Sequence, residues 1–360
     1  MTQYRVGIVG CGEAAQILHL PSLYQLQDKF TVTALCDASQ TVLDGVGEVW
    51  RVPNRFLDYR DLVARSDVDI VLIANPNAYH AEVALAAIEA GKHVLVEKPM
   101  CITLRENDAI VAARDKAGVV VQVGTMRRYA PAFVQACERV RGIENITLAR
   151  VHDVLGRNAQ IIEPTSRVIR GKDIPQAAME ATAARNDQLV IEAIGHLVPG
   201  EIPAAVKTAY NLLLGLSTHD ISAMRELLGM PQGVLYAAQR QNGIYLSAAF
   251  DYGGYICHFE TGVDVIPRFD ACLEVYSAEQ VVRVDYDTPY VRNLPIRLNV
   301  LAAEGVGVAN HSIHPAWGDA FVLEWEAFYD NIIHKRLPKT SPEDFRQDLE
   351  LFARMIQLMC

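Results

Sequence analysis

The tripeptide Glu97-Lys98-Pro99 follows the apolar run 93–96, and its residue types suggest chemistry more directly than any other part of this 360-residue chain. A lysine ammonium group can hydrogen-bond a substrate oxygen and stabilise negative charge that develops on it. The proline fixes its own backbone torsion and stiffens the turn, which helps to hold a reactive side chain in place. A second feature, the glycine-rich turn 10–15, follows the strand-like run 4–9 and suggests where a nucleotide cofactor binds.

The turn 10–15 has the residue spacing of dinucleotide-binding turns. Gly10 permits the tight turn, Gly12 lets a pyrophosphate approach the backbone, and Ala15 stands where a third glycine often allows close packing of helix on strand. The first N–H groups of the following helix lack helical partners and would face the phosphates. We therefore predict a cofactor site made by Gly10, Gly12, Glu13, Ala14 and Ala15.

Asp37 ends the next strand-like run, 31–36. A carboxylate at this place accepts hydrogen bonds from the ribose hydroxyls of an adenosine. It would also repel the 2′-phosphate of NADP, by about 4 kcal/mol per charge pair at ~4 Å and an effective dielectric constant of ~20. Half of that energy is already more than tenfold in affinity. The sequence thus predicts NAD in preference to NADP, although Asp37 could instead cap the next helix, for which Ser39 is better placed.

The segment Asn75-Pro76-Asn77 ends the run 69–74, and His80 follows one helical turn later. Residues at the carboxyl edge of a parallel sheet line the ligand crevice, so we expect Asn75, Pro76, Asn77 and His80 beside the cofactor. Two alternatives stay open, because Asn77 could cap the helix that begins here and His80 could be a structural histidine.

Short runs rich in valine, isoleucine and leucine alternate with helix signals in the first part of the chain. The predicted strands are 4–10, 31–36, 69–74, 93–96 and 119–123. Such runs are buried on both faces of a parallel sheet. Thr103 and Glu106 form a capping box at the start of one intervening helix, which Gly118 ends. The series predicts an α/β fold with a doubly wound parallel sheet in a nucleotide-binding domain, residues 1–125.

A second domain is predicted over residues 126–360. It begins with a helix over 129–140 and a strand over 145–155, and the proline- and alanine-rich stretch 156–205 is predicted to be an insertion with one or two helices. A meander of antiparallel strands follows. Its strands are 233–238, 244–251, 255–262, 269–276 and 280–284. The chain closes with an amphipathic helix that Ser341 caps, with Pro342 at its first position.

Charge and composition narrow the function classes. A net charge of −10 argues against a nucleic-acid or anionic-membrane partner, since either would need a basic surface. Seven cysteines without zinc or redox spacing fit a reducing compartment, and neither a leader sequence nor an apolar run of membrane-spanning length is recognised. We therefore expect a cytoplasmic enzyme. Glu192 and His196 have the i, i+4 spacing of a metal pair, but no third ligand accompanies them and no metal site is predicted.

Several motifs occur together in a fixed order along the chain. They are Gly10-x-Gly12-x-x-Ala15, Asn75-Pro76-Asn77-x-x-His80, Glu97-Lys98-Pro99, His219-Asp220 before an apolar helix, Phe321-x-x-Glu324-x-x-Ala327-Phe328, and Pro338-x-Thr340-Ser341-Pro342-Glu343-Asp344. With these motifs the chain resembles the Gfo/Idh/MocA family, the glucose–fructose oxidoreductase and inositol dehydrogenase-like proteins. The resemblance covers essentially the whole chain except 156–205.

The resemblance implies a Rossmann domain followed by an α/β domain with a large, open, mostly antiparallel sheet. It implies a nicotinamide cofactor, a sugar, polyol or related hydroxyl as substrate, and homodimers or homotetramers that pair through an apolar face of the open sheet. Lys98 then matches the lysine that contacts the substrate hydroxyl, and His219 matches the usual general base. The resemblance also places Glu97 near the nicotinamide ribose and a cis bond before Pro99.

Gly215 departs from the family pattern, because many catalytic members carry an aspartate four residues before the histidine that matches His219. Three explanations stay open: an acid is supplied elsewhere, Lys98 and His219 suffice alone, or this chain does not perform the usual oxidation. The candidate acids are Asp153, Asp187, Glu192 and Asp220. Two alternative functions follow, an NADP-linked reductase of keto-sugars or aldehydes and a cofactor-binding protein without turnover.

Further substrate contacts are expected at two places. Arg127 and Arg128 follow the last strand of the first domain, where one of them, such as Arg127, could meet the substrate or the cofactor or form a hinge salt bridge. His152 and Asp153 end the strand 145–155, which should reach the substrate pocket. The insertion 156–205 precedes His219, so we expect it to cover or reshape that pocket.

Overall fold

The computed structural model describes residues 2–314 and 317–360, which form two compact units. The first unit comprises the chain up to Gly124 together with Ser166–Ala193 and Phe321–Leu349, and the second comprises Thr125–Thr165, Ile194–Ala320 and Glu350–Cys360. The chain first passes from the first unit to the second after Gly124, one residue before the end of the predicted domain 1–125. Two segments of the predicted domain 126–360, however, pack with the first unit.

The first unit contains a six-stranded parallel sheet with the strand order β3-β2-β1-β4-β5-β6. Its strands are β1 (Tyr4–Val9), β2 (Phe30–Cys36), β3 (Asn54–Phe56), β4 (Ile70–Ile73), β5 (His93–Glu97) and β6 (Val121–Gly124). The predicted doubly wound sheet is confirmed. The sequence did not reveal β3, whose three residues are all half-buried and form no continuous apolar run.

Local capping explains where the helices of this sheet begin and end. The helices are η1 (Ala15–His19), α1 (Leu20–Gln25), α2 (Gln40–Val49), α3 (Tyr59–Val63), η2 (Asn77–Tyr79), α4 (His80–Glu89) and α5 (Leu104–Ala117). Ser39 caps α2 by accepting a hydrogen bond from the Val42 N–H, and Thr103 and Glu106 form the predicted capping box of α5. Gly118 ends α5 with φ +68°, a left-handed conformation that favours glycine.

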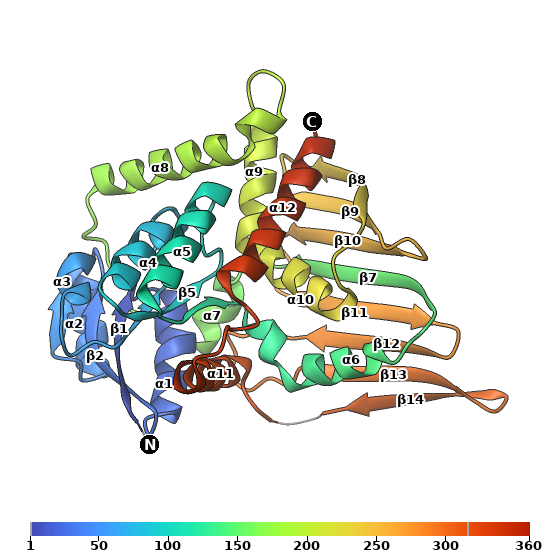
Figure 1. Ribbon diagram of the computed structural model, residues 1–360, viewed down its shortest axis with the longest axis horizontal. Helices are drawn as coiled ribbons and strands as arrows, with labels where there is room; N and C mark the ends of the chain where they lie inside the picture. Colours follow the sequence, from blue (N-terminus) through green and yellow to red (C-terminus); the bar gives the residue numbers. More distant parts are fainter. Residues whose placement is uncertain (1, 315–316) are drawn as a thin grey trace. The chain divides into compact units, whose positions relative to one another are not determined.

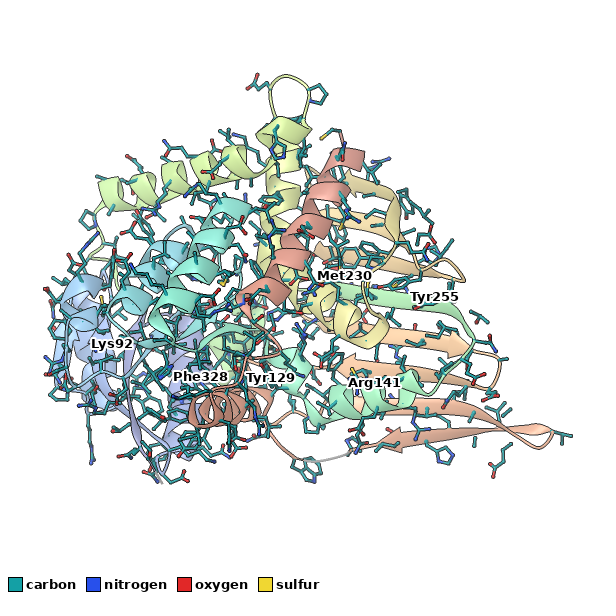
Figure 2. All side chains as sticks on the ribbon, viewed as in Figure 1. Lys92, Tyr129, Arg141, Met230, Tyr255 and Phe328 are labelled. Carbon is teal, nitrogen blue, oxygen red and sulfur yellow. The ribbon has the colours of Figure 1, made fainter. Side chains whose placement is uncertain are left out.

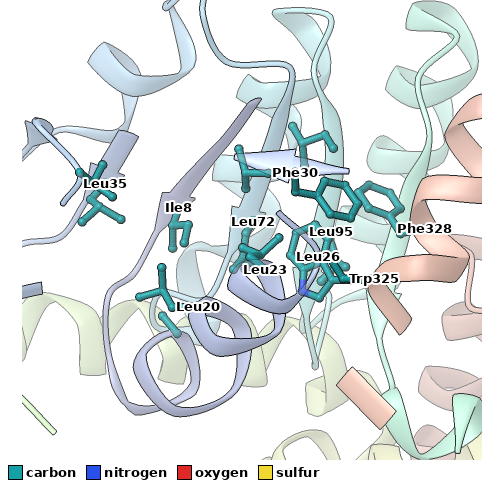
Figure 3. Close-up of a cluster of buried hydrophobic side chains, with 14 of the residues drawn as sticks. Ile8, Leu20, Leu23, Leu26, Phe30, Leu35, Leu72, Leu95, Trp325 and Phe328 are labelled. Atoms are coloured by element: carbon teal, nitrogen blue, oxygen red, sulfur yellow. The ribbon is translucent and has the colours of Figure 1, made fainter. Parts of the chain in front are cut away.

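The core of the first unit draws on both ends of the chain. Ile8, Leu35, Leu72 and Leu95 from the sheet belong to one buried cluster that also includes Trp325 and Phe328 of α11 (Ala320–His334) (Figure 3). The ring of Trp325 meets that of Phe30 edge to face, with 5.1 Å between centroids. The aromatic pairs explain why α11 returns to the nucleotide-binding sheet.

The second unit is built on an eight-stranded sheet with the order β14-β13-β12-β11-β7-β10-β9-β8 (Figure 1). Its strands are β7 (Ile146–Leu155), β8 (Gly233–Arg240), β9 (Tyr245–Asp251), β10 (Ile256–Val263), β11 (Phe269–Ser277), β12 (Gln280–Tyr286), β13 (Arg297–Glu304) and β14 (Gly307–Ile313). All neighbouring pairs are antiparallel except β10 with β7. The predicted mostly antiparallel sheet is confirmed, but the meander is interrupted because β7 lies between β10 and β11.

Helices cover one face of this sheet, and the other face carries charge. The helices of the unit are η3 (Met126–Tyr129), α6 (Pro131–Arg141), α7 (Ala159–Thr165), η4 (Gly195–Leu197), α9 (Ala204–Leu212), η5 (Leu213–Ser217) and α10 (Thr218–Leu228). Of these, α6 and α10 pack on the sheet. On the opposite face Arg283 pairs with Glu274 at 2.6 Å and with Asp285 at 2.6 Å. The middle of this uncovered face, on β11 and β12, is therefore more polar than the apolar face that we expected for pairing between subunits. Leu235 and Leu301, on outer strands of the sheet, are exposed.

The stretch 156–205 is helical, as predicted, but it is divided between the units. Its longest helix, α8 (Gln176–Ile194), lies mostly in Ser166–Ala193, which packs with the first unit. The chain closes with α12 (Pro342–Leu358), where the Asp344 N–H donates to the Ser341 hydroxyl as the predicted cap requires. Figure 2 shows the side chains, with Phe328 on α11 and Tyr255 in the turn between β9 and β10.

Candidate functional site

A cleft of about 760 Å³ lies at the carboxyl edge of the parallel sheet in the first unit. The loops that follow β1, β2, β3 and β4 supply its inner wall, and the segment around the start of α8 supplies the outer wall. The lining residues are Val9, Gly10, Gly12, Cys36, Asp37, Ala38, Leu57, Asp58, Tyr59, Arg60, Ala74, Asn75, Pro76, Tyr79, Ile174, Ala178, Ala181 and Thr182. The structure thus brings together five of the predicted cofactor residues, Gly10, Gly12, Asp37, Asn75 and Pro76.

The two glycines of the turn are needed for different reasons. Gly10 has φ +93°, and a Cβ there would lie 2.4 Å from the backbone of Ala74 and of Asn75. Gly12, in contrast, has no protein atom within 4 Å of the place where a Cβ would stand. A side chain at Gly12 would therefore project into the cleft, so the fold leaves this space for a ligand rather than for packing. This arrangement fits the close approach of a pyrophosphate.

Asp37 is fixed between two loops of the cleft. Its Oδ2 accepts a hydrogen bond from the Cys11 N–H at 2.8 Å, and its Oδ1 accepts one from the Ser39 N–H at 2.9 Å. A carboxylate has about four lone-pair sites, so this one retains capacity for ribose hydroxyls. The alternative role as the cap of α2 belongs to Ser39 instead.

Four other predicted cofactor residues, Glu13, Ala14, Ala15 and Asn77, are not among the residues that line the cleft. Ala15 is fully buried, and Ala14 is half-buried at the start of the helical segment η1. The Glu13 carboxylate pairs with Arg170 at 2.5 Å on the surface of the first unit. Asn77 opens the 3₁₀ turn η2, and no side-chain hydrogen bond caps that turn or α4.

His80 holds the lysine turn in place. Its ring nitrogens lie 2.7 Å from the carbonyl oxygen of Pro99 and 2.7 Å from that of Asn75, and its side chain is only 1% exposed. The structure therefore favours the structural alternative for His80, which joins the loop after β4 to the turn after β5. The Lys98–Pro99 peptide bond is cis, as the resemblance implies.

Glu97 belongs to a buried relay that the sequence did not reveal. The indole N–H of Trp325 donates to His19 Nδ1 at 3.1 Å, and His19 Nε2 lies 2.8 Å from Glu97 Oε1. Because the indole can only donate, the His19 proton must stand on Nε2, from which it is donated to Glu97. Burial opposes ionisation of Glu97, but the His19 hydrogen bond and the Lys98 charge outweigh it and lower the pKa of Glu97. The Lys98 N–H also donates to Glu97 Oε2 at 3.1 Å.

His219 stands in the first turn of α10 and is half-buried. Gly215 lies in the π-helical segment η5 immediately before α10, and a Cβ at Gly215 would meet open space. Packing within the described chain therefore does not explain why a carboxylate is missing at this position. Lys98 lies in the first unit and His219 in the second.

A buried ion-pair network joins α10 to β7 in the second unit. Arg127 Nη1 lies 2.9 Å from Asp153 Oδ2 and 2.5 Å from Asp220 Oδ1, and all three residues are at most 3% exposed. Burial and the neighbouring Asp153 raise the pKa of Asp220 although Arg127 opposes the shift. Arg127 and Asp153, expected to contact substrate, are thus placed in a salt bridge that holds the helix on the sheet.

His152 points to the opposite face of the sheet from Asp153. Successive strand residues alternate in direction, and the His152 ring faces Glu260 at 3.4 Å and Asp270 at 3.3 Å. His152 and Asp153 therefore cannot both contact one substrate as expected, because their side chains leave β7 on opposite faces of the sheet.

Of the other two candidate acids, Glu192 pairs with Arg105 at 2.7 Å, and Asp187 lies half-exposed on α8 in the first unit.

The outer wall of the cleft is the part that sequence reasoning missed. Ala178, Ala181 and Thr182 have the i, i+3, i+4 spacing of one helix face, and together with Ile174 they line the cleft. This spacing was visible in the sequence, but nothing in it shows against which surface the face packs. Part of the stretch expected to cover or reshape a substrate pocket therefore lines this cleft of the first unit.

Residues 4–125 match the profile of the family GFO_IDH_MocA, described as "Oxidoreductase family, NAD-binding Rossmann fold". This part of the chain is a Gfo/Idh/MocA Rossmann domain. The chain is 37% identical over 136 residues to inositol 2-dehydrogenase of Salmonella typhimurium, a match that covers 36% of this chain and only 39% of that relative.

Two solved structures share the fold of this chain over nearly its whole length. Levoglucosan dehydrogenase in complex with NADH has a TM-score of 0.75 and 18% identity, covering 99% of this chain and 97% of that one. A 3-ketoreductase from Actinomadura kijaniata in complex with TDP-benzene and NADP has a TM-score of 0.72 and 18% identity, with the same coverage. The two neighbours hold different nicotinamide cofactors. The comparisons therefore support a nicotinamide cofactor without selecting between NAD and NADP.

Within the described chain, no helix combines the length and the apolarity that crossing a membrane requires. The same residues contain no group of three or more histidine, cysteine or carboxylate side chains placed to hold a metal ion.

Proposed function

We propose that the protein is an NAD-dependent oxidoreductase that transfers a hydride between nicotinamide and a secondary hydroxyl of a sugar, polyol or glycoside. The observation that carries this proposal is the common position of two features in the first unit. The dinucleotide cleft is formed at the ends of β1, β2, β3 and β4, and the Glu97-Lys98 turn begins at the end of the adjacent β5. The names of the similar proteins, an inositol dehydrogenase and a levoglucosan dehydrogenase, point to the same substrate class.

The residues of the cleft have the properties that binding NAD requires. Gly12 leaves room for the pyrophosphate, Asp37 offers carboxylate oxygens to the adenosine ribose, and Asn75-Pro76 forms the opposite rim. Bound NAD would supply the hydride acceptor. Asp37 favours NAD over NADP, because a 2′-phosphate would face a fixed carboxylate.

Lys98 and His219 would handle the proton and the charge on the substrate oxygen. Lys98 hydrogen-bonds that oxygen and stabilises the alkoxide character that develops as the C–H bond breaks. His219 accepts the hydroxyl proton, and returns it in the reverse direction. The relay from Trp325 through His19 fixes Glu97, which in turn bonds the backbone N–H of Lys98 and orients the turn.

A spectrophotometric screen tests this proposal. The protein is mixed with NAD or NADP and with inositols, aldoses, sugar acids or glycosides, and the absorbance of the reduced nicotinamide is followed. We expect NAD to be reduced by one substrate group. The Lys98→Ala variant should lose about two to four powers of ten in kcat and keep its NAD affinity. Lys116→Ala removes an exposed lysine of α5 and serves as the matched control, with turnover unchanged.

A cofactor-binding role without turnover is the second candidate, and Gly215 is the observation that favours it. Calorimetric titration of NAD separates the two, because both candidates predict binding and only the first predicts turnover. Tight NAD binding together with silence across the whole substrate panel would support the second candidate. If neither nicotinamide cofactor bound, both would be wrong.

A further inference from the structure

The segment Ser166–Ala193 is fastened to both sides of the cofactor cleft. On one side the Gln16 amide N–H donates to the Cys11 carbonyl at 2.7 Å and to the Ile169 carbonyl at 2.9 Å, and the Ile169 N–H donates to the Gln16 amide oxygen at 2.8 Å. On the other side Arg185 pairs with Glu82 at 2.6 Å and lies 4.4 Å from the ring centre of Tyr79. These bonds hold the segment against the cleft, which its residues Ile174, Ala178, Ala181 and Thr182 line together with Asp37.

Within this segment Asp173 reaches the loop that follows β2. Its Oδ1 lies 2.5 Å from the Ser39 hydroxyl, and its Oδ2 accepts a hydrogen bond from the Thr41 N–H at 3.0 Å. Ser39 is fully buried, and its hydroxyl already accepts from Val42, so its proton is free to be donated to Asp173. These two bonds lower the pKa of Asp173 to about 2, so the carboxylate is charged at neutral pH.

The close approach of the segment to Ser39 depends on Gly171. A Cβ at Gly171 would lie 1.9 Å from the Ser39 Oγ and 2.6 Å from Asp173 Oδ1. The glycine therefore lets the backbone pass directly over the start of α2. The contact depends on a glycine, a fixed carboxylate and a buried hydroxyl together. It is therefore a specific packing contact between the segment and the start of α2.

The contact between Asp173 and Ser39 adjoins Asp37 and Ala38, which line the cleft at the end of β2. The 2′-phosphate of NADP extends from the ribose hydroxyl that Asp37 binds, toward the loop between the second strand and its helix. The donors there are the Ser39 hydroxyl and the Thr41 N–H at the start of α2, and a phosphate would use them as other anions use helix N-termini. In this protein both donors are committed to Asp173.

We propose that Asp173 is a second determinant of cofactor choice, so that the inserted segment excludes NADP by occupying the 2′-phosphate donors with a carboxylate and repelling the phosphate. This inference rests on the proposed function, because it assumes that the cleft takes a nicotinamide dinucleotide. It assigns a specificity role to a residue outside the Rossmann core. Asp37 and Asp173 would then flank the phosphate position from two separate segments.

Two cations near the cleft oppose this effect. Arg60 lines the cleft, but its guanidinium pairs with Asp58 at 3.3 Å and with Glu82 at 3.1 Å. Lys172 precedes Asp173 and is exposed. Because Asp58 and Glu82 already engage Arg60, its charge does not neutralise the carboxylate of Asp173.

The test is the ratio of the dissociation constants of NADP and NAD, measured by calorimetric titration without substrate. Asp173→Asn removes the charge and keeps both contacts, because its amide oxygen can accept from Thr41 while its N–H donates to Ser39. We expect NADP affinity to rise about fivefold at low ionic strength, as for an exposed charge contact. NAD affinity should stay within about twofold, and the gain should shrink as salt is added. Asp173→Lys should give a larger gain.

A control variant separates the effect of the Asp173 charge from the effect of a weaker attachment of the segment Ser166–Ala193. Arg170→Ala removes the pair with Glu13 and loosens the same segment without changing Asp173. A merely structural role predicts that Asp173→Asn and Arg170→Ala weaken NAD and NADP alike and leave the ratio unchanged, which would overturn the inference. A wild-type protein that prefers NADP would also overturn it. Failure of the wild type to bind either cofactor would instead refute the proposed function itself.

Discussion

The Arg127 network allows a stability prediction that can be worked from the structure. Arg127→Met keeps an unbranched apolar side chain but removes the guanidinium that faces Asp153 and Asp220, which are both at most 1% exposed. Removing one partner from a buried ion pair typically costs about 3–5 kcal/mol, because a buried charge is left uncompensated. The variant also loses the contacts of the guanidinium with the rings of Tyr286 and Phe269, at 5.0 Å and 5.4 Å. We therefore expect a loss of about 3–5 kcal/mol in the free energy of unfolding of the second unit at pH 8.

The loss should become smaller as the pH falls. Burial and Asp153 already raise the pKa of Asp220 in the folded protein, and removal of Arg127 raises it further. Between the unfolded and the folded pKa the native state holds the extra proton, so stability falls with rising pH and is recovered on acidification. At pH 5.5 the destabilisation by Arg127→Met should thus be clearly less than at pH 8.

Hydrogen exchange of peptides from β7 and α10 measures this effect locally, since a chain of two units need not unfold in one step. Adding Asp153→Asn and Asp220→Asn to Arg127→Met should restore most of the stability, because the buried charges are then gone. Arg139→Met, at an exposed arginine of α6, is the control and should change stability by less than about 0.5 kcal/mol. A loss below about 1 kcal/mol for Arg127→Met, or a loss that grows in acid, would contradict the reasoning.

The first unit yields further predictions. Gly10→Ala should lower both stability and NAD affinity, because its Cβ would lie 2.4 Å from the backbone of Ala74 at φ +93°. Gly12→Ala should leave the melting temperature unchanged and weaken NAD binding more than tenfold, since its Cβ meets only the cleft; equal effects of the two variants in melting and titration experiments would refute this contrast. Glu324 is fully buried, and burial followed by the Glu97 charge raises its pKa. The wild type should therefore lose stability relative to Glu324→Gln as the pH rises above the ordinary carboxyl range, and urea unfolding of both proteins between pH 6 and 9 measures whether their difference widens.

The sequence predicted the parts of the fold whose signals are local. The turn at Gly10, the capping box of Thr103 and Glu106, and the apolar strands of the parallel sheet all depend on neighbours in the chain. The features of the fold that could not be predicted from the sequence depend on contacts between segments far apart in the chain. The placement of β7 between β10 and β11, and the return of Trp325 to His19, depend on long-range pairing that no local pattern encodes.

The candidate site shows the same division. Asp37 and Asn75 could be predicted because the ends of parallel strands always meet at one edge of the sheet. His152 and Asp153 could have been separated from the sequence, since adjacent strand residues face opposite sides. The role of Asp173 could not be predicted, because the sequence does not say which surface an inserted segment covers.

The ion pairs of the candidate acids bear on whether one of them replaces the aspartate that is missing at Gly215. Among the candidate acids, Glu192 is engaged by Arg105, while Asp153 and Asp220 share the guanidinium of Arg127. Two carboxyls that share one buried cation and include one with a raised pKa carry little net charge for orienting His219. These contacts weigh against Asp153, Glu192 and Asp220 as the acid that is supplied elsewhere. The explanation in which Lys98 and His219 suffice alone, and the one in which this chain does not perform the usual oxidation, both stay open. Because a Cβ at Gly215 meets open space, a lack of room does not account for the missing carboxylate there.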